Sequence, residues 1–196
     1  MKLVVGISGA SGSPYASRLL AHLREHCEDV EVHVVLSRTA EQVYAHECGG
    51  HPREHGYPTF GGRDYGAPCA SGSGGFGSMV VIPASMSAVA RIAHGISDDL
   101  LTRAADVMLK ERRPLLVVPR ETPYSAIHLE NMLSITRSGA VVLPASPSFY
   151  GRPQSVTDVL DTVVARVLSH LGIDSELSGR WGRDIQLGEA PAEGRS

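Results

Sequence analysis

Cysteine-rich motifs and long apolar runs are both missing from this sequence. Its three cysteines, Cys27, Cys48 and Cys69, share no C-x-x-C spacing, and their odd number argues against a disulfide framework and a zinc site alike. No apolar stretch approaches the roughly 20 residues that cross a bilayer, and the apolar start at residues 3–7 is too short and wrongly flanked for a signal peptide. We therefore expect a cytoplasmic protein without a membrane segment, and three ordinary thiols.

An excess of positive charge is missing as well. The chain has 18 Lys and Arg against 21 Asp and Glu, a formal net charge of -3, so it lacks the broad basic face that nucleic-acid binding requires. With 196 residues, of which 42% are hydrophobic, it fits one core better than two. We expect one folded domain over residues 1–183 and a polar C-terminal tail over residues 184–196.

Short apolar runs alternate with helical patterns along the chain. The runs predict strands over residues 2–7, 30–36, 79–83, 114–119 and 140–144, and apolar spacing predicts helices over 15–25, 39–46, 98–110, 127–135 and 155–171. Such alternation indicates an α/β fold with a single doubly wound, mainly parallel sheet and helices on both faces, Rossmann-like or flavodoxin-like. Residues 49–77, rich in Gly, Pro and His, interrupt the pattern and are predicted to form a lid or contact loop.

Polar residues follow the predicted strands. Sheets of this kind bind ligands beyond the carboxyl ends of their strands, which places residues 8–13, Ser37, residues 84–88, Arg120 and residues 146–150 along one rim. The turn Ser8-Gly-Ala-Ser-Gly-Ser13 offers close backbone approach and free helix N–H groups to an anion. It is not a G-x-G-x-x-G motif, so a plain strand-to-helix connection remains an equal interpretation.

Other polar residues divide into functional and structural candidates. Arg120 follows a buried strand at the rim, where its fork of donors suits a phosphate or a flavin carbonyl. Glu47 ends a predicted helix, where its charge opposes the helix dipole, and is a candidate acid or base. A solvated helix end accounts for Arg112 and Arg113, and a structural role accounts for His128 and Glu130. The sixteen-residue spacing of Tyr150 and Arg166 does not predict that they meet.

Seven ordered motifs, spread over nearly the whole chain, resemble the UbiX-type flavin prenyltransferases, formerly described as aromatic-acid or phenolic-acid decarboxylase small subunits. They are Gly9-Ala-Ser-Gly12, Ala70-Ser-Gly-Ser73, Leu101-Thr-Arg-Ala-Ala-Asp106, Leu109-Lys-Glu-Arg-Arg-Pro114, Val118-Pro-Arg-Glu121, Ile127-His-Leu-Glu-Asn-Met132 and Phe149-Tyr-Gly-Arg-Pro-Gln154.

The resemblance implies an enzyme that joins a dimethylallyl group to N5 and C6 of reduced FMN. The donor would be dimethylallyl phosphate or the pyrophosphate, phosphate would leave, and no metal would be needed. The product, prenylated FMN, would serve a UbiD-type decarboxylase. Relatives form dodecamers, so the resemblance also implies a homo-oligomer of that size.

Residue roles also follow from the resemblance, motif by motif. It implies catalytic roles for Ser11, Glu47 and Tyr150. FMN binding is implied for Gly9, Ala10, Ser11, Ser37, Ser85, Met86, Ser87, Ala88 and Arg120, and substrate binding for Lys110, Tyr150, Arg166 and Trp181. Two positions depart from the family pattern: Ala88 lacks a hydroxyl that relatives carry, and Tyr65 stands where several relatives have Trp. The departure at Ala88 concerns the affinity for FMN, and the departure at Tyr65 concerns the preference for the prenyl substrate.

Three other functions remain open at this stage. A flavin-dependent cysteine decarboxylase shares the expected fold, but its early catalytic His and Pro-x-Met-Asn motif are missing, since the segment reads Pro83-Ala-Ser-Met. A non-catalytic FMN-binding subunit has no need for the phosphate-binding residues. Direct decarboxylation of an aromatic acid lacks an evident clamp for that acid.

Overall fold

Six parallel strands form one sheet in the order β3-β2-β1-β4-β5-β6. The computed structural model describes residues 1–179 and 182–186. Its strands are β1 (Lys2–Ile7), β2 (Glu31–Leu36), β3 (Thr59–Gly61), β4 (Ser78–Ala84), β5 (Leu115–Pro119) and β6 (Val141–Val142). Its α-helices are α1 (Ser13–His26), α2 (Ala40–Cys48), α3 (Met86–Ala93), α4 (Leu100–Lys110), α5 (Ala126–Arg137) and α6 (Val156–His170).

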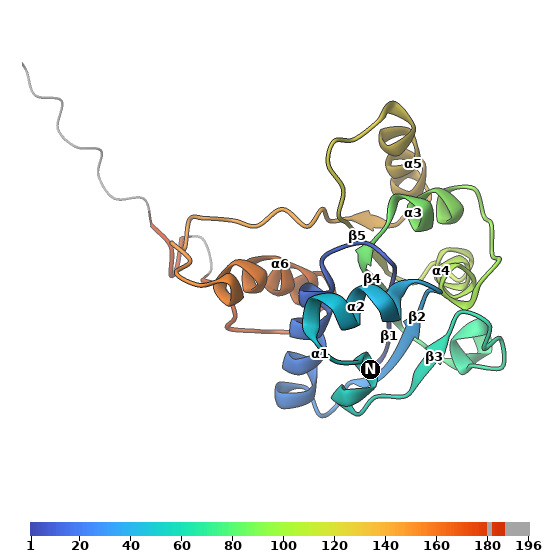
Figure 1. The fold of residues 1–196 in the computed structure, drawn as a ribbon, viewed down its shortest axis with the longest axis horizontal. Coiled ribbons are helices and arrows are strands. Elements are labelled where there is room, and N and C mark those ends of the chain that lie inside the picture. The colour runs from blue at the N-terminus through green and yellow to red at the C-terminus, as the bar shows by residue number, and fades with distance from the viewer. Residues whose placement is uncertain (180–181, 187–196) are drawn as a thin grey trace, which may run out of the picture.

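Both faces of the sheet are covered, because side chains on a strand alternate between faces. On β1, Leu3, Val5 and Ile7 belong to the apolar cluster under α1, α2 and α6. Val4 belongs to the cluster under α3, α4 and α5. Figure 1 shows these helices arranged around the central strands. The predicted doubly wound parallel sheet is therefore confirmed.

The strand order reverses between β1 and β4. The chain runs outward from β1 to β2 and β3, returns to the centre at β4, and runs outward again to β5 and β6. This is the Rossmann order, and ligands of such sheets bind where the two halves diverge, beyond the carboxyl ends of the strands. The turn after β1 and the turn after β4 meet at this point.

The segment 49–77 is more ordered than the predicted lid or contact loop. It contains β3, which pairs in parallel with β2, and three short 3₁₀ helices, Pro52–His55, Pro68–Ala70 and Gly72–Gly74. Cys69 and Phe76 are buried in the core. Arg113, predicted to lie on a solvated helix end, donates hydrogen bonds to the carbonyls of Phe76 and Gly72, each 3.0 Å long. The prediction for Arg113 was wrong, because its side chain fastens this segment to the domain, whereas a lid or contact role of residues 49–77 stays a prediction.

The remaining elements lie close to their predicted bounds, except that α3 was not predicted and β6 is only two residues long. All three cysteines are free thiols. In the described part of the chain, no helix has the length and apolar character needed to cross a membrane.

Candidate active site at the carboxyl rim

The glycine turn after β1 is held by a carboxylate from another helix. Glu47, near the end of α2, accepts hydrogen bonds from the backbone N–H groups of Gly12 (2.9 Å) and Ser13 (2.8 Å). Gly12 precedes α1 and has no side chain to cap it, so Glu47 satisfies free N–H groups that a helix N-terminus always presents. The carboxylate therefore occupies two donors that the sequence analysis assigned to an anion, and Glu47 has a structural role.

The same contacts set the charge of Glu47. Burial alone would raise the pKa of its carboxyl, but hydrogen bonds from the Ser11 hydroxyl and from Gly12 and Ser13 outweigh burial and hold that pKa below its ordinary value. Glu47 is therefore ionised at neutral pH and sits beside Ser11, as a weak base with three donors around it.

Two links join the turn after β1 to the turns after β4 and β5, and the first of them is buried. The Ser8 hydroxyl donates to the carbonyl of Pro83 (2.8 Å) and accepts from the N–H of Ser85 (2.7 Å). Arg120 donates from Nε to the carbonyl of Ser11 (2.9 Å). The rim residues Ser11, Ser85 and Arg120, which the sequence placed together from separate motifs, are thus in one connected site.

A cavity of about 900 Å³ opens beside these turns. It is lined by Gly9, Ser37, Arg38, Thr39, Gly61, Gly62, Arg63, Asp64, Ser85, Ser87, Arg91, Asp98 and Asp99. Its volume lies in the range of about 300–1,000 Å³ typical of small-molecule sites. Four of the predicted cofactor residues, Gly9, Ser37, Ser85 and Ser87, line it.

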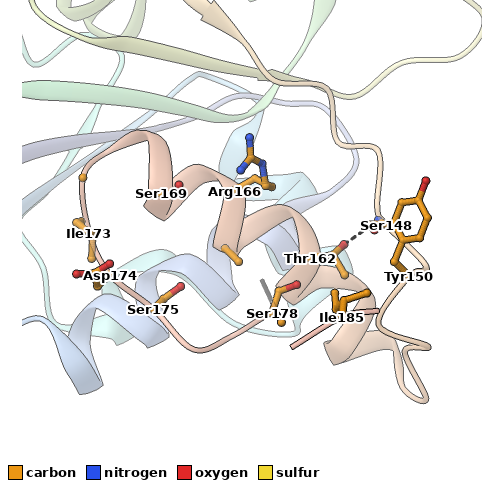
Figure 2. Close-up of a pocket in the computed structure, with 13 residues that line it drawn as sticks. Ser148, Tyr150, Thr162, Arg166, Ser169, Ile173, Asp174, Ser175, Ser178 and Ile185 are labelled. Atoms are coloured by element: carbon orange, nitrogen blue, oxygen red, sulfur yellow. Dashed lines mark hydrogen bonds between the residues drawn. The ribbon is translucent and has the colours of Figure 1, made fainter. Parts of the chain in front are cut away.

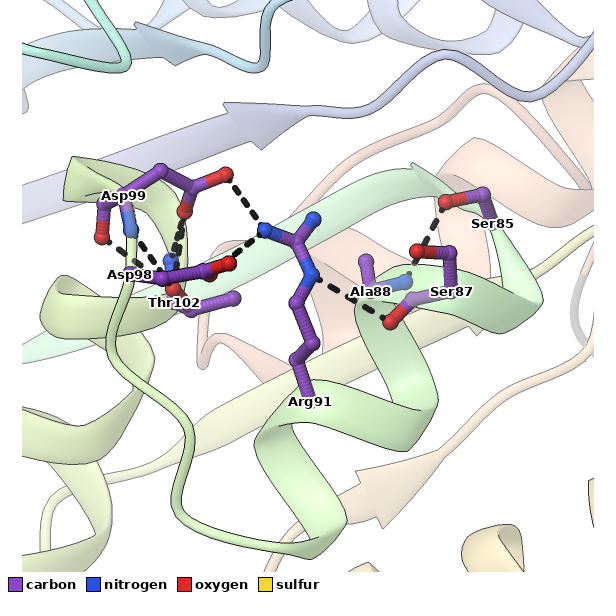
Figure 3. Close-up of polar contacts among 7 residues, drawn as sticks. All are labelled: Ser85, Ser87, Ala88, Arg91, Asp98, Asp99 and Thr102. Atoms are coloured by element: carbon purple, nitrogen blue, oxygen red, sulfur yellow. Dashed lines mark hydrogen bonds and ion pairs between the residues drawn. The ribbon is translucent and has the colours of Figure 1, made fainter.

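The residues of this cavity fit the phosphate end of a flavin nucleotide. Ser37 is only 7% exposed and lines the cavity, and its hydroxyl makes no hydrogen bond with another described residue, so the hydroxyl is available to a ligand there. A Cβ atom on Gly9 would collide with the side chain of Thr39, which shows that only glycine allows the backbone to pass here. Arg91, held by Asp98 and Asp99, adds guanidinium donors (Figure 3).

Three other predicted cofactor residues have buried side chains. Ala10 and Met86 are 8% exposed, and Ala88 is fully buried within α3. The N–H of Ala88 donates to the Ser85 hydroxyl (3.3 Å), which caps α3. The side chain at position 88 faces the core, so the hydroxyl that this chain lacks there would also lie at a buried position. Tyr65 is 48% exposed and lies next to the cavity residue Asp64.

The predicted substrate residues are not at this rim. Tyr150 and Arg166 line a different cavity of about 510 Å³ between α6 and the segments before and after it (Figure 2). Ile185, from the predicted tail, lines that cavity too. Lys110 ends α4 just before β5, at the amino edge of the sheet, where it pairs with Glu111. Trp181 lies outside the described residues.

Among the described residues, no group of three His, Cys, Asp or Glu side chains could hold a metal ion. His128, for which no chemistry was predicted, accepts from the Ser125 N–H and donates its own N–H to the Ser125 hydroxyl, so it caps α5. The polar chemistry of the rim therefore consists of hydroxyls, guanidinium groups and carboxylates.

Known proteins share this sequence along most of its length. A family model described as Flavoprotein matches residues 1–168. Flavin prenyltransferase UbiX of Thermoplasma acidophilum is 46% identical over 184 residues, which cover 92% of this chain and 100% of that protein. Its counterpart in Pseudomonas aeruginosa is 44% identical, with 92% of this chain and 94% of that protein covered. The chain belongs to the UbiX family of flavin prenyltransferases.

Solved UbiX-like structures share the fold closely. A dodecameric FMN-dependent UbiX-like decarboxylase from Escherichia coli O157:H7 has a TM-score of 0.88 and 43% identity, covering 92% of this chain and 99% of that chain. A UbiX protein in complex with FMN and dimethylallyl pyrophosphate has a TM-score of 0.88 and 42% identity, covering 92% and 96%. The FMN-dependent cysteine decarboxylase SpaF, at 18% identity and a TM-score of 0.61, shares the fold alone.

Sequence reasoning missed several residues of the cavity. Gly61 and Arg63 come from the segment around β3, predicted as a lid or contact loop, and Arg91 comes from α3, of which the sequence placed only the first residues, 86–88, on the rim. A signal for α3 was present, because Met86, Val89 and Ile92 recur at helical spacing and are buried. That helix would have placed Arg91 one turn after Ser87.

Proposed function

We propose that this protein transfers a dimethylallyl group from dimethylallyl phosphate to N5 and C6 of reduced FMN, and so supplies prenylated FMN to a UbiD-type decarboxylase. The observation that carries the proposal is the cavity at the strand switch point, with Ser37 and three arginines in its lining, in a chain of the flavin prenyltransferase family. The relative solved with FMN and dimethylallyl pyrophosphate supports the same pair of ligands here.

FMN would lie along the rim with its phosphate in the cavity. Ser37, Ser85 and Ser87 would donate hydroxyl hydrogen bonds to the phosphate end, and the exposed backbone at Gly9 would let the ligand approach. The ring end would then reach the turn that carries Ser11, where Arg120 is already hydrogen-bonded. Arg120 has further donors for a flavin carbonyl.

Glu47 and Ser11 would act on the reacting edge of the ring. Closing the second ring at C6 requires loss of a proton, and the Glu47 carboxylate is ionised and therefore free to accept one. Its lowered pKa makes it a weak base, which suits a ring that has become acidic after alkylation. The departing phosphate is the competing acceptor for the same proton.

Lys110, Tyr150 and Arg166 would stabilise the departing phosphate, because cationic and hydroxyl donors stabilise charge that develops on a leaving group. Within one chain they lie in two places away from the rim. We therefore propose that the complete site is shared between subunits of a homo-oligomer, with a dodecamer as the expected assembly.

An apolar helix surface supports such an assembly. The side chains of Ile127, Leu129 and Leu133 on α5 are 68%, 54% and 49% exposed. Only Asn131 and Ile135 of that helix are buried. Leu129 and Leu133, four residues apart, share one exposed face of α5. Exposed apolar patches are typical of protein interfaces, and the family relative from E. coli is dodecameric.

Mass spectrometry of the flavin tests the function directly. Reduced FMN and dimethylallyl phosphate are incubated with the protein, and the extracted flavin is compared with a reaction that contains heat-denatured protein. The expected product is heavier than reduced FMN by C5H8, that is, by one dimethylallyl group less the hydrogen atom that it replaces. Unmodified flavin in a sample whose FMN binding has been verified would refute the transferase activity.

A further inference from the structure

Arg91 is fixed in the cavity by contacts on both sides. It lies on α3 one turn after Ser87, so the two residues share a helix face. Its Nη1 donates to Asp98 and to Asp99, each at 2.8 Å, and its Nε donates to the carbonyl of Ser87 at 3.4 Å. The side chain is 23% exposed. Figure 3 shows the guanidinium held between the carboxylates and the first turn of α3.

One nitrogen of this guanidinium, Nη2, is available to a ligand. Among the described residues, Nη2 of Arg91 has no hydrogen-bond partner, and Arg91 lines the cavity of about 900 Å³. An arginine whose other nitrogens are already engaged presents its remaining two N–H donors in a fixed direction. This arrangement suits an acceptor that arrives with the ligand.

The two carboxylates offset the charge of Arg91, and they also fix the direction of its free donors. Asp99 caps α4, where it accepts from the N–H and the hydroxyl of Thr102, each at 2.8 Å. Burial raises the pKa of Asp99, but the bonds from Thr102 and Arg91 outweigh it and hold that pKa below its ordinary value. Asp98 is 59% exposed and screened by water. The carboxylates therefore orient Arg91, and its unpaired donors favour an anion.

Other donors gather around the same space. Ser85 and Ser87 lie at the start of α3, whose first N–H groups have no partners within the helix. Ser37, which is 7% exposed, lines the cavity as well. A phosphate monoester, with three acceptor oxygens and a charge near -2 at neutral pH, matches this set of hydroxyls, N–H groups and guanidinium.

We propose that Arg91 is a specificity-determining residue that binds the phosphate of FMN through Nη2, so that this protein selects phosphorylated flavin over riboflavin. The proposal rests on the proposed function and adds a residue to its flavin site. Arg91 supplies a charge, whereas Ser37, Ser85 and Ser87 supply only neutral hydroxyls. The preference for FMN should therefore depend on Arg91 more than on any one of these serines.

Titration with two flavins tests the proposal on the flavin-free, fully assembled protein. The dissociation constants of FMN and riboflavin are measured by fluorescence quenching for the parent, Arg91→Gln, Asp98→Asn and Arg24→Gln. Arg24 lies over the Tyr57 ring, away from the cavity, and serves as a matched control. Thermal unfolding and light scattering of each variant without flavin show whether fold and assembly are intact.

We expect Arg91→Gln to weaken FMN binding about tenfold to hundredfold, as for loss of a charged hydrogen bond, and riboflavin binding far less. Asp98→Asn should strengthen FMN binding alone, because it removes a negative charge near the phosphate, and Arg24→Gln should change neither constant.

Equal losses for both flavins in Arg91→Gln would show a structural role and overturn the proposal. A parent that binds FMN with an FMN-to-riboflavin ratio unchanged in Arg91→Gln would overturn the assignment of Arg91 alone. A parent that binds neither flavin would overturn the proposed function as well.

Discussion

At the scale of single residues, Glu47 joins the fold to the proposed chemistry. Its carboxylate caps α1 from α2 and sits beside Ser11. A negative charge at a helix N-terminus stabilises the helix, by about 0.3–1 kcal/mol at exposed sites. A base that is already hydrogen-bonded in the resting protein also needs little movement to receive a proton. The same residue can therefore contribute to stability and to catalysis, and the two contributions can be measured separately.

Replacing Glu47 with Gln keeps the shape of the side chain and removes its charge. We expect flavin binding to survive and product formation to slow by about 10²–10⁴-fold, as for loss of a general base. Stopped-flow flavin spectra, read beside mass spectra, measure the slow step. Glu41→Gln, on the exposed face of the same helix, is the control. A parental rate in Glu47→Gln would leave the departing phosphate as the proton acceptor.

The stability that the Glu47 cap gives to the folded protein should depend on pH. Because the folded protein holds the pKa of Glu47 below its ordinary value of 4.5, the unfolded chain takes up this proton first as the pH falls. The stabilisation is thus present above about pH 4.5 and is lost as the pH drops through the folded pKa. Chemical unfolding should show the parent more stable than Glu47→Gln near neutral pH, with the difference shrinking in acid. A difference that stays constant over this range would contradict the cap.

Residue roles were predictable only where a motif and a strand end coincided. Ser11, Ser85 and Arg120 follow β1, β4 and β5, and parallel strands bring such positions to one rim whatever the loops do. Tyr150 and Arg166 share a cavity because α6 packs back along the segment that precedes it, and spacing does not encode that path. Arg91 was not predicted because its helix was not predicted, and the sequence alone does not show which carboxylates it contacts.

At the scale of elements, the segment from residues 68 to 76 is held against the end of α4. Phe76 and Cys69 are buried, and Arg113 donates to two carbonyls of this segment. β1 was predictable because its apolar run is long enough to cross the core. β3 was not, because Thr59–Gly61 has three residues and gains its place only by pairing with β2. α3 was not predicted because the serines at its start are typical of a turn.

Removing the Arg113 side chain tests that attachment. We expect Arg113→Ala to lower the free energy of unfolding by about 1–3 kcal/mol, since it leaves carbonyl groups without their charged donor. Limited proteolysis should cut the variant sooner within residues 68–76. Arg112→Ala, a neighbour without those bonds, should behave like the parent. Equal protease resistance in Arg113→Ala would mean that apolar burial alone holds the segment.

At the scale of the whole molecule, the proposed machinery is divided among distant places. The flavin rim lies at the carboxyl edge of the sheet, Lys110 lies at the amino edge, and Tyr150 lies beside α6. One chain carries all these residues but does not bring them together. Neighbouring copies that complete one another's sites would account for this. Symmetric homo-oligomers build such shared sites at every interface.

Mixing two inactive variants tests for shared sites. Lys110→Ala and Glu47→Gln chains are each expected to be nearly inactive, and co-expression should restore activity. If each site takes the two residues from different subunits, random assembly leaves about a quarter of the sites intact. Mixing the separately assembled proteins without exchange is the control. No recovery in co-assembled oligomers would place both residues in the site of a single chain.

The exposed helix α5 gives a second test of assembly. We expect Leu129→Glu combined with Leu133→Glu to reduce the mass measured by light scattering, because a charge buried at an interface without a partner is costly. Circular dichroism should remain that of the parent, since both side chains are exposed in the single chain. Glu130→Gln, on the same helix, should keep the parental mass. An unchanged mass in the double variant would place the interface elsewhere.

The buried hydroxyl of Ser8 should affect how fast the rim opens and how fast flavin binds. Because it joins the turns after β1 and β4 by two hydrogen bonds, the two halves of the rim cannot separate without breaking buried contacts. The amide hydrogen of Ser85 should then exchange with deuterium slowly in the empty protein, and binding should slow it little further. Association with flavin would be governed by diffusion into an open, preformed cavity, with an observed rate that rises linearly with flavin concentration and shows no plateau.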